Sequence, residues 1–392
     1  MKRSLLGLAL CGLTTVAAAQ PIRLGELNSY DAQPVLLDAY RKGWKLALEE
    51  INATGGLLGR PVEVISRDDH ANASDAVRVA EELLFRDHAV LIFGTRQSDV
   101  ALAVADFAKR RKVLFLAAEP MSDRITGQSG KRYTFRLAPS TSMQVRMLVP
   151  TAAKFKRKRW ALIYPDDEDG RSAAETFKRL LKATQPDAEF VAELATPTGR
   201  VDAGAWAQAL SDARPNAIFN ALVGPALKDF VREGGLRGLF DGLPVLSILA
   251  GWPEYLEPLR TDAPEGWLVT GYPAYGIATP EHGRFLQAYR ARWQADPRMG
   301  SVIGYSAMQS IAAAIRRADS TDTERLVEAF RELSVSTPFG RIRYRAIDHQ
   351  ATLGAYVGST TWRAGRGVLI HARYVDGAAV MPPDAQVLQG RP

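Results

Sequence analysis

The chain has few cysteines and histidines, the residues that form disulfides and bind zinc. Among 392 residues there are one cysteine, Cys11, and five histidines. A single cysteine cannot form an internal disulfide, so burial of apolar side chains has to stabilise the fold. The histidines do not have the spacing of a zinc site, and the sequence lacks the Gly-x-Ser-x-Gly elbow, the phosphate-binding loop and the dinucleotide fingerprint. We therefore expect no metal, no cofactor and no enzymatic activity.

Long apolar runs are scarce as well, apart from the start of the chain. That start has a basic, an apolar and a small-residue part: Met1–Arg3, Ser4–Val16 and Ala17–Ala19. The pattern predicts a cleaved secretory signal over residues 1–19, too short for a membrane span. The alternative is a lipoprotein anchored through Cys11, but Leu10 fits that motif poorly. We expect export to the periplasm, with a mature chain that contains no cysteine.

The charge is basic overall, with 50 Lys and Arg against 43 Asp and Glu. The densest basic run is Lys154–Arg159, which could meet an anionic partner or form a solvated loop before the next strand. We favour the loop, because only Phe155 interleaves with the charges and nucleic acid is not expected outside the cytoplasm. The composition therefore indicates a globular protein without a nucleic-acid partner.

Strand and helix patterns alternate along the mature chain of about 370 residues, a length that suggests two domains. Ala89–Gly94 is a continuous apolar run, typical of a parallel strand that is buried on both faces. The alternation restarts after Arg136, with strands expected near Trp160–Tyr164 and Ala217–Ala221. This pattern predicts an α/β fold with two doubly wound, parallel-sheet lobes.

Seven phrases, spread over nearly all of the mature chain, carry a family resemblance. They are Ile51-Asn-Ala-Thr-Gly-Gly-Leu-Leu-Gly59, Arg67-Asp-Asp69, Phe93-Gly-Thr-Arg-Gln-Ser98, Tyr133-Thr-Phe-Arg136, Trp160-Ala-Leu-Ile-Tyr164, Pro264-Glu-Gly-Trp-Leu-Val-Thr270 and Gly304-Tyr-Ser-Ala-Met-Gln-Ser310. Together they resemble the type I periplasmic solute-binding proteins of ABC importers, and most closely the branched-chain amino-acid (Leu/Ile/Val) binding proteins. The resemblance implies three hinge crossings, near Pro139, Gly271 and Pro338. Lobe one would then be 21–139 plus 271–337, and lobe two 140–270 plus 338–392.

Ser98 is the strongest candidate for ligand binding. It follows a strand end and the Gly94 turn and opens a helix, so its hydroxyl and the free N–H groups of the first turn suit a carboxylate. The resemblance implies that this serine holds the ligand carboxylate, while an ordinary helix cap is the alternative. Arg96 is a candidate partner for the same carboxylate, unless it points to solvent.

The end of the next strand supplies three more candidates, Ala118, Glu119 and Met121. The family has a run of small residues there, often ending in threonine, and this chain departs from it. Glu119 could accept a ligand ammonium group or could be a solvated turn residue. Tyr30, in the first loop of lobe one, is also expected near the cleft, because ligands bind at the carboxyl ends of strands in open α/β folds.

Four further candidates depend mainly on the resemblance. Tyr305 matches a family tyrosine that walls the cleft, although a core position is equally compatible with its helical spacing. Asp169 stands where the family has an aromatic residue, and is either part of a solvated acidic loop or an acceptor for a ligand amine. Trp252 could replace that aromatic wall, and Val223 should lie at the cleft edge of lobe two.

These observations predict a monomeric periplasmic receptor that captures a small carboxylate-bearing solute and delivers it to an ABC permease in the inner membrane. A solute that touches both lobes would shift the protein toward a closed state. A ligand-sensing subunit of an amide or amino-acid signalling system is the alternative, and a secreted hydrolase would need a nucleophile motif that is missing. For Asp68-Asp69-His70 we expect a structural role. Whether the ligand is a branched-chain or an aromatic acid stays open.

Overall fold

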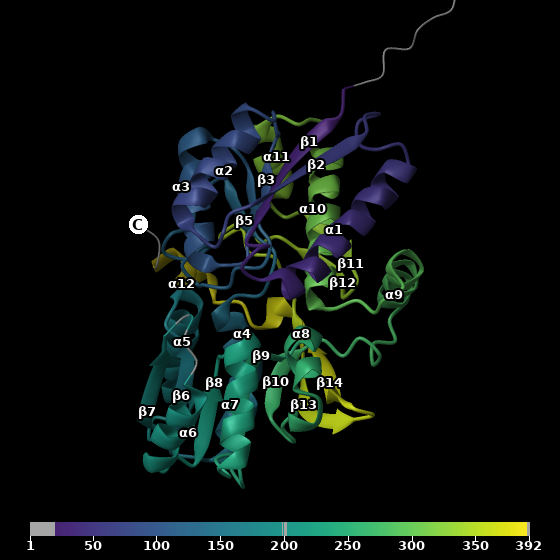
Figure 1. Ribbon diagram of the computed structural model, residues 1–392. Helices are drawn as coiled ribbons and strands as arrows, with labels where there is room; N and C mark the ends of the chain where they lie inside the picture. The colour runs from purple at the N-terminus through teal and green to yellow at the C-terminus, as the bar shows by residue number, and fades with distance from the viewer. Residues whose placement is uncertain (1–19, 198, 200–201, 390–392) are drawn as a thin grey trace, which may run out of the picture.

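The computed structural model describes residues 20–197, 199 and 202–389. The expected signal segment, with Cys11, lies outside these residues. The described chain forms two lobes, each built around its own sheet, one above the other in Figure 1. We find no helix in the described part that is long and apolar enough to cross a membrane. The predicted α/β fold with two mainly parallel sheets is confirmed.

Lobe one contains a five-stranded parallel sheet in the order β2-β1-β3-β4-β5. Its strands are β1 (Ile22–Asn28), β2 (Val62–Asp68), β3 (Ile92–Gly94), β4 (Phe115–Ala117) and β5 (Thr134–Arg136). The helices of this lobe are α1 (Pro34–Ala53), α2 (Ala73–Phe85), α3 (Ser98–Arg111), α9 (Pro280–Trp293), α10 (Met299–Ala318) and α11 (Thr323–Phe330). A small hairpin, β11 (Ser334–Thr337) and β12 (Gly340–Arg343), completes it.

Lobe two contains a seven-stranded sheet in the order β14-β13-β10-β9-β8-β6-β7. Its strands are β6 (Arg159–Pro165), β7 (Glu189–Thr196), β8 (Ala217–Asn220), β9 (Val245–Gly251), β10 (Leu268–Gly271), β13 (Ala355–Arg363) and β14 (Arg366–Val375). The β10–β13 and β13–β14 pairings are antiparallel, and the other pairings of this sheet are parallel. The helices are α4 (Thr141–Ala152), η1 (Ala153–Phe155), α5 (Glu168–Thr184), α6 (Ala203–Asp212), α7 (Gly224–Leu236), α8 (Pro253–Leu256) and η2 (Glu257–Asp262), followed near the C-terminus by η3 (Gly377–Ala379) and α12 (Asp384–Gln389).

The chain passes between the two sheets three times, after β5, after β10 and before β13. The first two passages lie close to the expected positions near Pro139 and Gly271. For the third we propose a boundary after Ala351 rather than near Pro338. β12 still pairs with β11, and the Arg136 strand end forms a bridge with Gln350. The other lobe boundaries remain proposals.

Helices α1 and α10 lie side by side over one face of the lobe-one sheet (Figure 1). Glycines allow the two backbones to approach closely. A Cβ at Gly43 would lie 2.1 Å from the Ser301 carbonyl oxygen, and one at Gly304 would lie 2.2 Å from the Tyr40 carbonyl oxygen. Apolar side chains such as Trp44, which is edge-on to Phe93, fill the space toward the sheet. This close contact fixes α10 against α1.

A carboxyl group is buried beneath α1. Glu26, in β1, is fully buried and accepts hydrogen bonds from the hydroxyls of Tyr30 (3.0 Å) and Ser66 (2.5 Å). Burial raises the pKa of Glu26 from 4.5 to about 8, although both hydroxyls and the nearby Arg41 act in the opposite direction. Desolvation of the charged form therefore outweighs its local stabilisation.

This shift predicts a pH dependence of stability. Because the folded state binds the Glu26 proton more tightly than the unfolded state, the stabilisation is complete below pH 4.5 and is lost as the pH rises through about 8. The free energy of unfolding should fall across that window by up to about 1.4 kcal/mol per pH unit for one such group. In Glu26→Gln the dependence should flatten, measured by urea unfolding from pH 5 to 8, whereas Glu63→Gln, at an exposed position of β2, should keep it. An equal slope in Glu26→Gln and the wild type would contradict this origin.

Candidate functional site

The expected ligand-binding residues of lobe one come from loops that follow two neighbouring strands. β3 and β4 pair in parallel, so their carboxyl ends meet at one edge of the sheet. After β3 the chain turns at Gly94, whose φ is 121° and where a Cβ would lie 2.2 Å from the Leu27 carbonyl oxygen. The Ala118 amide donates a hydrogen bond of 2.8 Å to the Gly94 carbonyl oxygen, so the two loops are tied together. They form one surface that faces lobe two.

Ser98 lies at the centre of this surface. It is the first residue of α3, and Gln97 holds the cap position, so the expectation that Ser98 could be an ordinary helix cap is wrong. Its hydroxyl oxygen instead accepts hydrogen bonds from the amides of Met121 (3.1 Å) and Ser122 (2.9 Å) in the loop after β4. The side chain thus joins the two loops while its proton remains free for an acceptor.

That acceptor is Asp169, in the first turn of α5 in lobe two. The Ser98 hydroxyl donates to Asp169 Oδ1, and the Met121 amide lies 3.3 Å from the same oxygen. Asp169 Oδ2 lies 3.7 Å from Arg96 Nη1. Burial raises the pKa of Asp169, opposed by Arg96, Ser98 and the Met121 amide. The alternative that Asp169 is part of a solvated acidic loop is therefore wrong, because its carboxylate is enclosed between the lobes.

Arg96 and Glu119 are buried beside this contact, with exposed fractions of 5% and 1%. The solvent-facing position considered for Arg96 and the solvated turn considered for Glu119 are therefore both wrong. Burial disfavours the charge of Arg96, but its neighbours Tyr255, Asp169 and Glu119 keep its pKa above the usual range. Burial raises the pKa of Glu119 to about 8, against the opposing effects of Arg96 and Asn28.

Two buried polar atoms of this group lack a hydrogen-bond partner among the described residues. They are Arg96 Nε and Glu119 Oε1. Glu119 Oε2 accepts a hydrogen bond of 3.4 Å from the Asn28 amide group, so only one oxygen of this carboxylate is satisfied. Unsatisfied buried atoms cost free energy, and a bound molecule with matching polar groups would remove that cost. The arrangement offers one unsatisfied donor and one unsatisfied acceptor.

Lobe two contributes a second loop, which follows β9. Trp252 is buried there and stacks on Tyr255, with ring centroids 5.9 Å apart and planes at 10°. Glu254, which lies between these two residues in the sequence, contacts lobe one. Its carboxylate accepts hydrogen bonds from the amides of Met299 (3.2 Å) and Gly300 (2.8 Å) at the start of α10. Sequence reasoning singled out Trp252 but missed Glu254 and Tyr255. Their position directly after a strand end was the signal that could have found them.

Two expected residues, Tyr30 and Tyr305, have partners outside this group, and a third, Val223, follows a different strand. Tyr30 donates to Glu26 beneath α1 and accepts a hydrogen bond of 3.4 Å from the Trp44 indole. Tyr305 donates to Glu50 of α1 (2.6 Å), and its ring contacts Phe285 of α9. Val223 is half-buried at the cap position of α7 in lobe two. The structure therefore brings together Ser98, Ala118, Glu119, Met121, Arg96, Asp169 and Trp252. The hydroxyls of Tyr30 and Tyr305 have other partners, and the place of Val223 at the cleft edge stays a prediction, consistent with the parallel pairing of β8 and β9.

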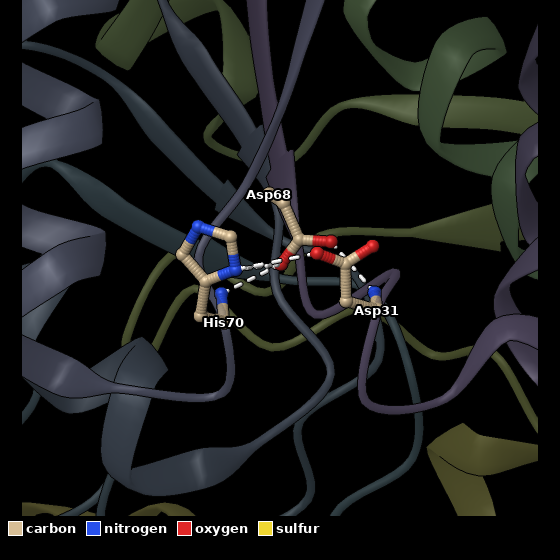
Figure 2. Close-up of side chains that lie close together, drawn as sticks. All are labelled: Asp31, Asp68 and His70. Atoms are coloured by element: carbon tan, nitrogen blue, oxygen red, sulfur yellow. Dashed lines mark hydrogen bonds and ion pairs between the residues drawn. The ribbon is translucent and has the colours of Figure 1, made fainter.

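A separate cluster lies where β1 and β2 end. Asp31, Asp68 and His70 point toward one another (Figure 2). The Asp68 carboxylate accepts hydrogen bonds of 2.6 Å from the backbone amides of both Asp31 and His70. Asp31 and His70 are exposed, so water already satisfies much of their polarity. The contacts tie two loops together, in line with the structural role expected for this segment.

Comparison with known proteins agrees with this architecture. A family model described as periplasmic binding protein matches residues 32–366. The chain belongs to this periplasmic binding protein family. Its members bind solutes and are not enzymes, which confirms the expectation drawn from the missing catalytic motifs.

Similar proteins from several bacteria show the same relationship. The Leu/Ile/Val-binding protein homolog 8 of Brucella abortus (strain 2308) is 25% identical over 349 residues, which cover 84% of this chain and 85% of that protein. The solute-binding protein of an ABC transporter from Rhodopseudomonas palustris BisB5, in complex with 3,4-dihydroxybenzoic acid, is 22% identical with a TM-score of 0.82 and covers 93% of this chain and 99% of that chain. The amino acid ABC transporter substrate-binding protein of Pseudomonas fluorescens Pf-5 is 23% identical with a TM-score of 0.83, covering 95% and 99%. The two structures share the fold of this periplasmic binding protein.

Proposed function

We propose that the protein is the periplasmic solute-binding subunit of an ABC importer and delivers a small carboxylate-bearing solute, an amino acid or an aromatic acid, to the permease. The observation that carries this proposal is the donor set around Ser98. The Ser98 hydroxyl, the Met121 amide and the Arg96 guanidinium converge on a carboxylate, that of Asp169, in a largely buried position between the lobes, where the Asp169 side chain is 15% exposed. A solute carboxylate would find the same donors.

The remaining groups of the site restrict which chemical groups the solute can carry besides its carboxylate. The stacked Trp252 and Tyr255 rings offer a flat apolar wall, which suits an aromatic acid. The unpaired oxygen of Glu119 suits a donor such as an ammonium or phenolic hydroxyl group. The relatives support both classes, since one is a Leu/Ile/Val-binding protein homolog and another was solved with 3,4-dihydroxybenzoic acid. We keep both classes in the proposal.

Thermal unfolding with a panel of solutes tests this function. The panel should contain leucine, phenylalanine, benzoate and 3,4-dihydroxybenzoate, with the corresponding carboxamide of each, which lacks the carboxylate charge, as its matched control. A solute at 100 times its dissociation constant adds about 2.7 kcal/mol to the free energy of unfolding and raises the midpoint. We expect at least one acid to stabilise the protein and its amide to do so far less. Equal stabilisation by acid and amide, or none by any acid, would contradict the proposed solute class.

Substitution of Ser98 tests the role of its hydroxyl. In Ser98→Ala the solute carboxylate loses one charge-assisted hydrogen bond, so we expect affinity to fall by about 1–3 kcal/mol, measured by calorimetric titration. Ser306→Ala is the control, because Ser306 is a buried serine of lobe one whose hydroxyl has no hydrogen-bond partner among the described residues. Unchanged affinity in Ser98→Ala would remove this residue from the site.

A further inference from the structure

Two carboxylates of lobe two each meet the first turn of a lobe-one helix. Asp169 contacts the Ser98 hydroxyl at the start of α3, and Glu254 accepts from the amides of Met299 and Gly300 at the start of α10. The first turn of a helix has free N–H groups and a partial positive charge, which favour an anion. The lobes are therefore held together by side chains of the chain itself.

The two contacts differ in whether they occupy the donors that a solute carboxylate would need. Glu254 is satisfied by two backbone amides, within the 2.8–3.2 Å range of ordinary hydrogen bonds. Asp169, by contrast, occupies the same donors that the proposed solute carboxylate needs: the Ser98 hydroxyl, the Met121 amide and Arg96. The Ser98 hydroxyl has a single proton, and among the described residues Arg96 is the cation that forms an ion pair with Asp169. Two carboxylates cannot share this set, because they would repel each other in a buried position.

We propose that Asp169 is a built-in competitor for the solute carboxylate, and that it both holds the lobes closed without solute and lowers the apparent affinity for solute. The inference rests on the proposed function, since it concerns the same site. Binding then proceeds by exchange: the Asp169 carboxylate leaves Ser98, Met121 and Arg96, and the solute carboxylate takes its place. The apparent dissociation constant is the intrinsic one divided by the fraction of chains in which Asp169 is displaced. Asp169 thus determines which acids bind tightly enough to be selected.

The position of Asp169 on α5 links its detachment from Ser98 to the contact between the two lobes. The neighbouring Glu168 binds the Ser122 hydroxyl (2.6 Å) and Arg124 (3.0 Å) of lobe one, so the first turn of α5 is docked through adjacent side chains. Both Ser122 and Met121 belong to the loop after β4 that also carries Glu119. A carboxylate exchange at Asp169 is therefore mechanically linked to the packing of this loop against lobe two.

The first arm of the test measures lobe separation without solute. The described chain contains no cysteine, so Lys109→Cys in lobe one and Lys182→Cys in lobe two, both exposed, allow spin labels and a distance measurement. We expect a short distance in the labelled parent and a shift to longer distances in Asp169→Ala, with a partial shift in Asp169→Asn, which keeps the size but loses the charge. Asp166→Ala is the control, because Asp166 is an exposed neighbour paired only with Arg171 among the described residues. An unchanged distance in both Asp169 variants would overturn the proposal.

The second arm measures affinity for the carboxylate that stabilises the parent protein best in the solute panel. Removing the competitor should tighten its binding at least threefold in Asp169→Ala, with no change in Asp166→Ala. Weaker binding in Asp169→Ala would overturn the proposal, because it would show that Asp169 contacts the solute directly. If no carboxylate binds parent or variant, the proposed function fails, and the distance measurement alone still decides whether Asp169 closes the lobes. Circular dichroism of each variant confirms that it is folded before either arm is interpreted.

Discussion

Replacement of Arg96 with glutamine is expected to lower the free energy of unfolding by about 3–5 kcal/mol and to abolish measurable binding of acidic solutes. Arg96 is the guanidinium that Asp169 and Glu119 share in a buried position. Without it, two carboxyl groups are left in a low-dielectric environment and must take up protons or water. Solute binding fails for the same reason, because an entering carboxylate no longer meets the Arg96 cation in the buried site.

Urea unfolding and calorimetric titration check this result, with Arg23→Gln as the matched control. The Arg23–Glu63 pair spans 3.3 Å on the exposed face of lobe one, so its loss should cost less than about 1 kcal/mol and leave solute affinity unchanged. The double variant Arg96→Gln with Asp169→Asn should regain part of the lost stability, because it removes one of the uncompensated carboxylates. Similar free energies of unfolding for Arg96→Gln and Arg23→Gln would show that the stability of the protein does not depend on the Arg96 cation in the buried cluster.

Gly43→Ala is expected to destabilise the protein by about 3 kcal/mol, a large effect for the addition of one methyl group. The new Cβ would lie 2.1 Å from the Ser301 carbonyl oxygen, and the obstacle is backbone rather than a flexible side chain. Helices α1 and α10 would have to separate, which weakens the packing along their whole contact and disturbs the start of α10, where Glu254 binds. We therefore expect a lower unfolding midpoint together with weaker closure of the lobes.

Gly283→Ala provides the matched control for this substitution. Gly283 also lies inside a helix, α9, but a Cβ there meets no atom within 4 Å. Alanine is favoured over glycine in a helix interior, so this variant should gain about 0.5–1 kcal/mol, seen as a higher urea midpoint. Destabilisation of similar size in both variants would mean that helix propensity, and not the close approach of α1 and α10, explains the effect at Gly43.

Local patterns in the sequence were sufficient for much of the fold. The apolar run before Gly94 predicted a strand that ends at a turn, and the structure has β3 ending there, although it is shorter than the run Ala89–Gly94. A run of apolar residues reports burial, which extends beyond the residues that make strand hydrogen bonds, and this explains the difference in length. Ser98 was located correctly at the start of a helix for the same local reason. The alternative of an ordinary cap was wrong, because its hydroxyl turns to the loop of Met121.

Residues whose roles depend on distant partners were placed less well. Tyr305 was expected in the cleft from its position in a family phrase, but its hydroxyl binds Glu50, which lies 255 positions earlier in the chain. Glu119 and Arg96 were each given a solvated alternative, because nothing in the neighbouring sequence shows that lobe two covers them.

The sequence by itself determined the order of strands and helices, the division into two α/β lobes and the family, because hydrophobic periodicity, turn residues and family phrases are properties of neighbouring positions. Only the tertiary structure decided that Asp169 meets Ser98 across 71 positions and that Glu254 meets the start of α10. Those contacts depend on how the two lobes are placed against each other. Burial between the lobes changes Asp169 from an acidic loop residue into a carboxylate held by a serine hydroxyl, a loop amide and an arginine.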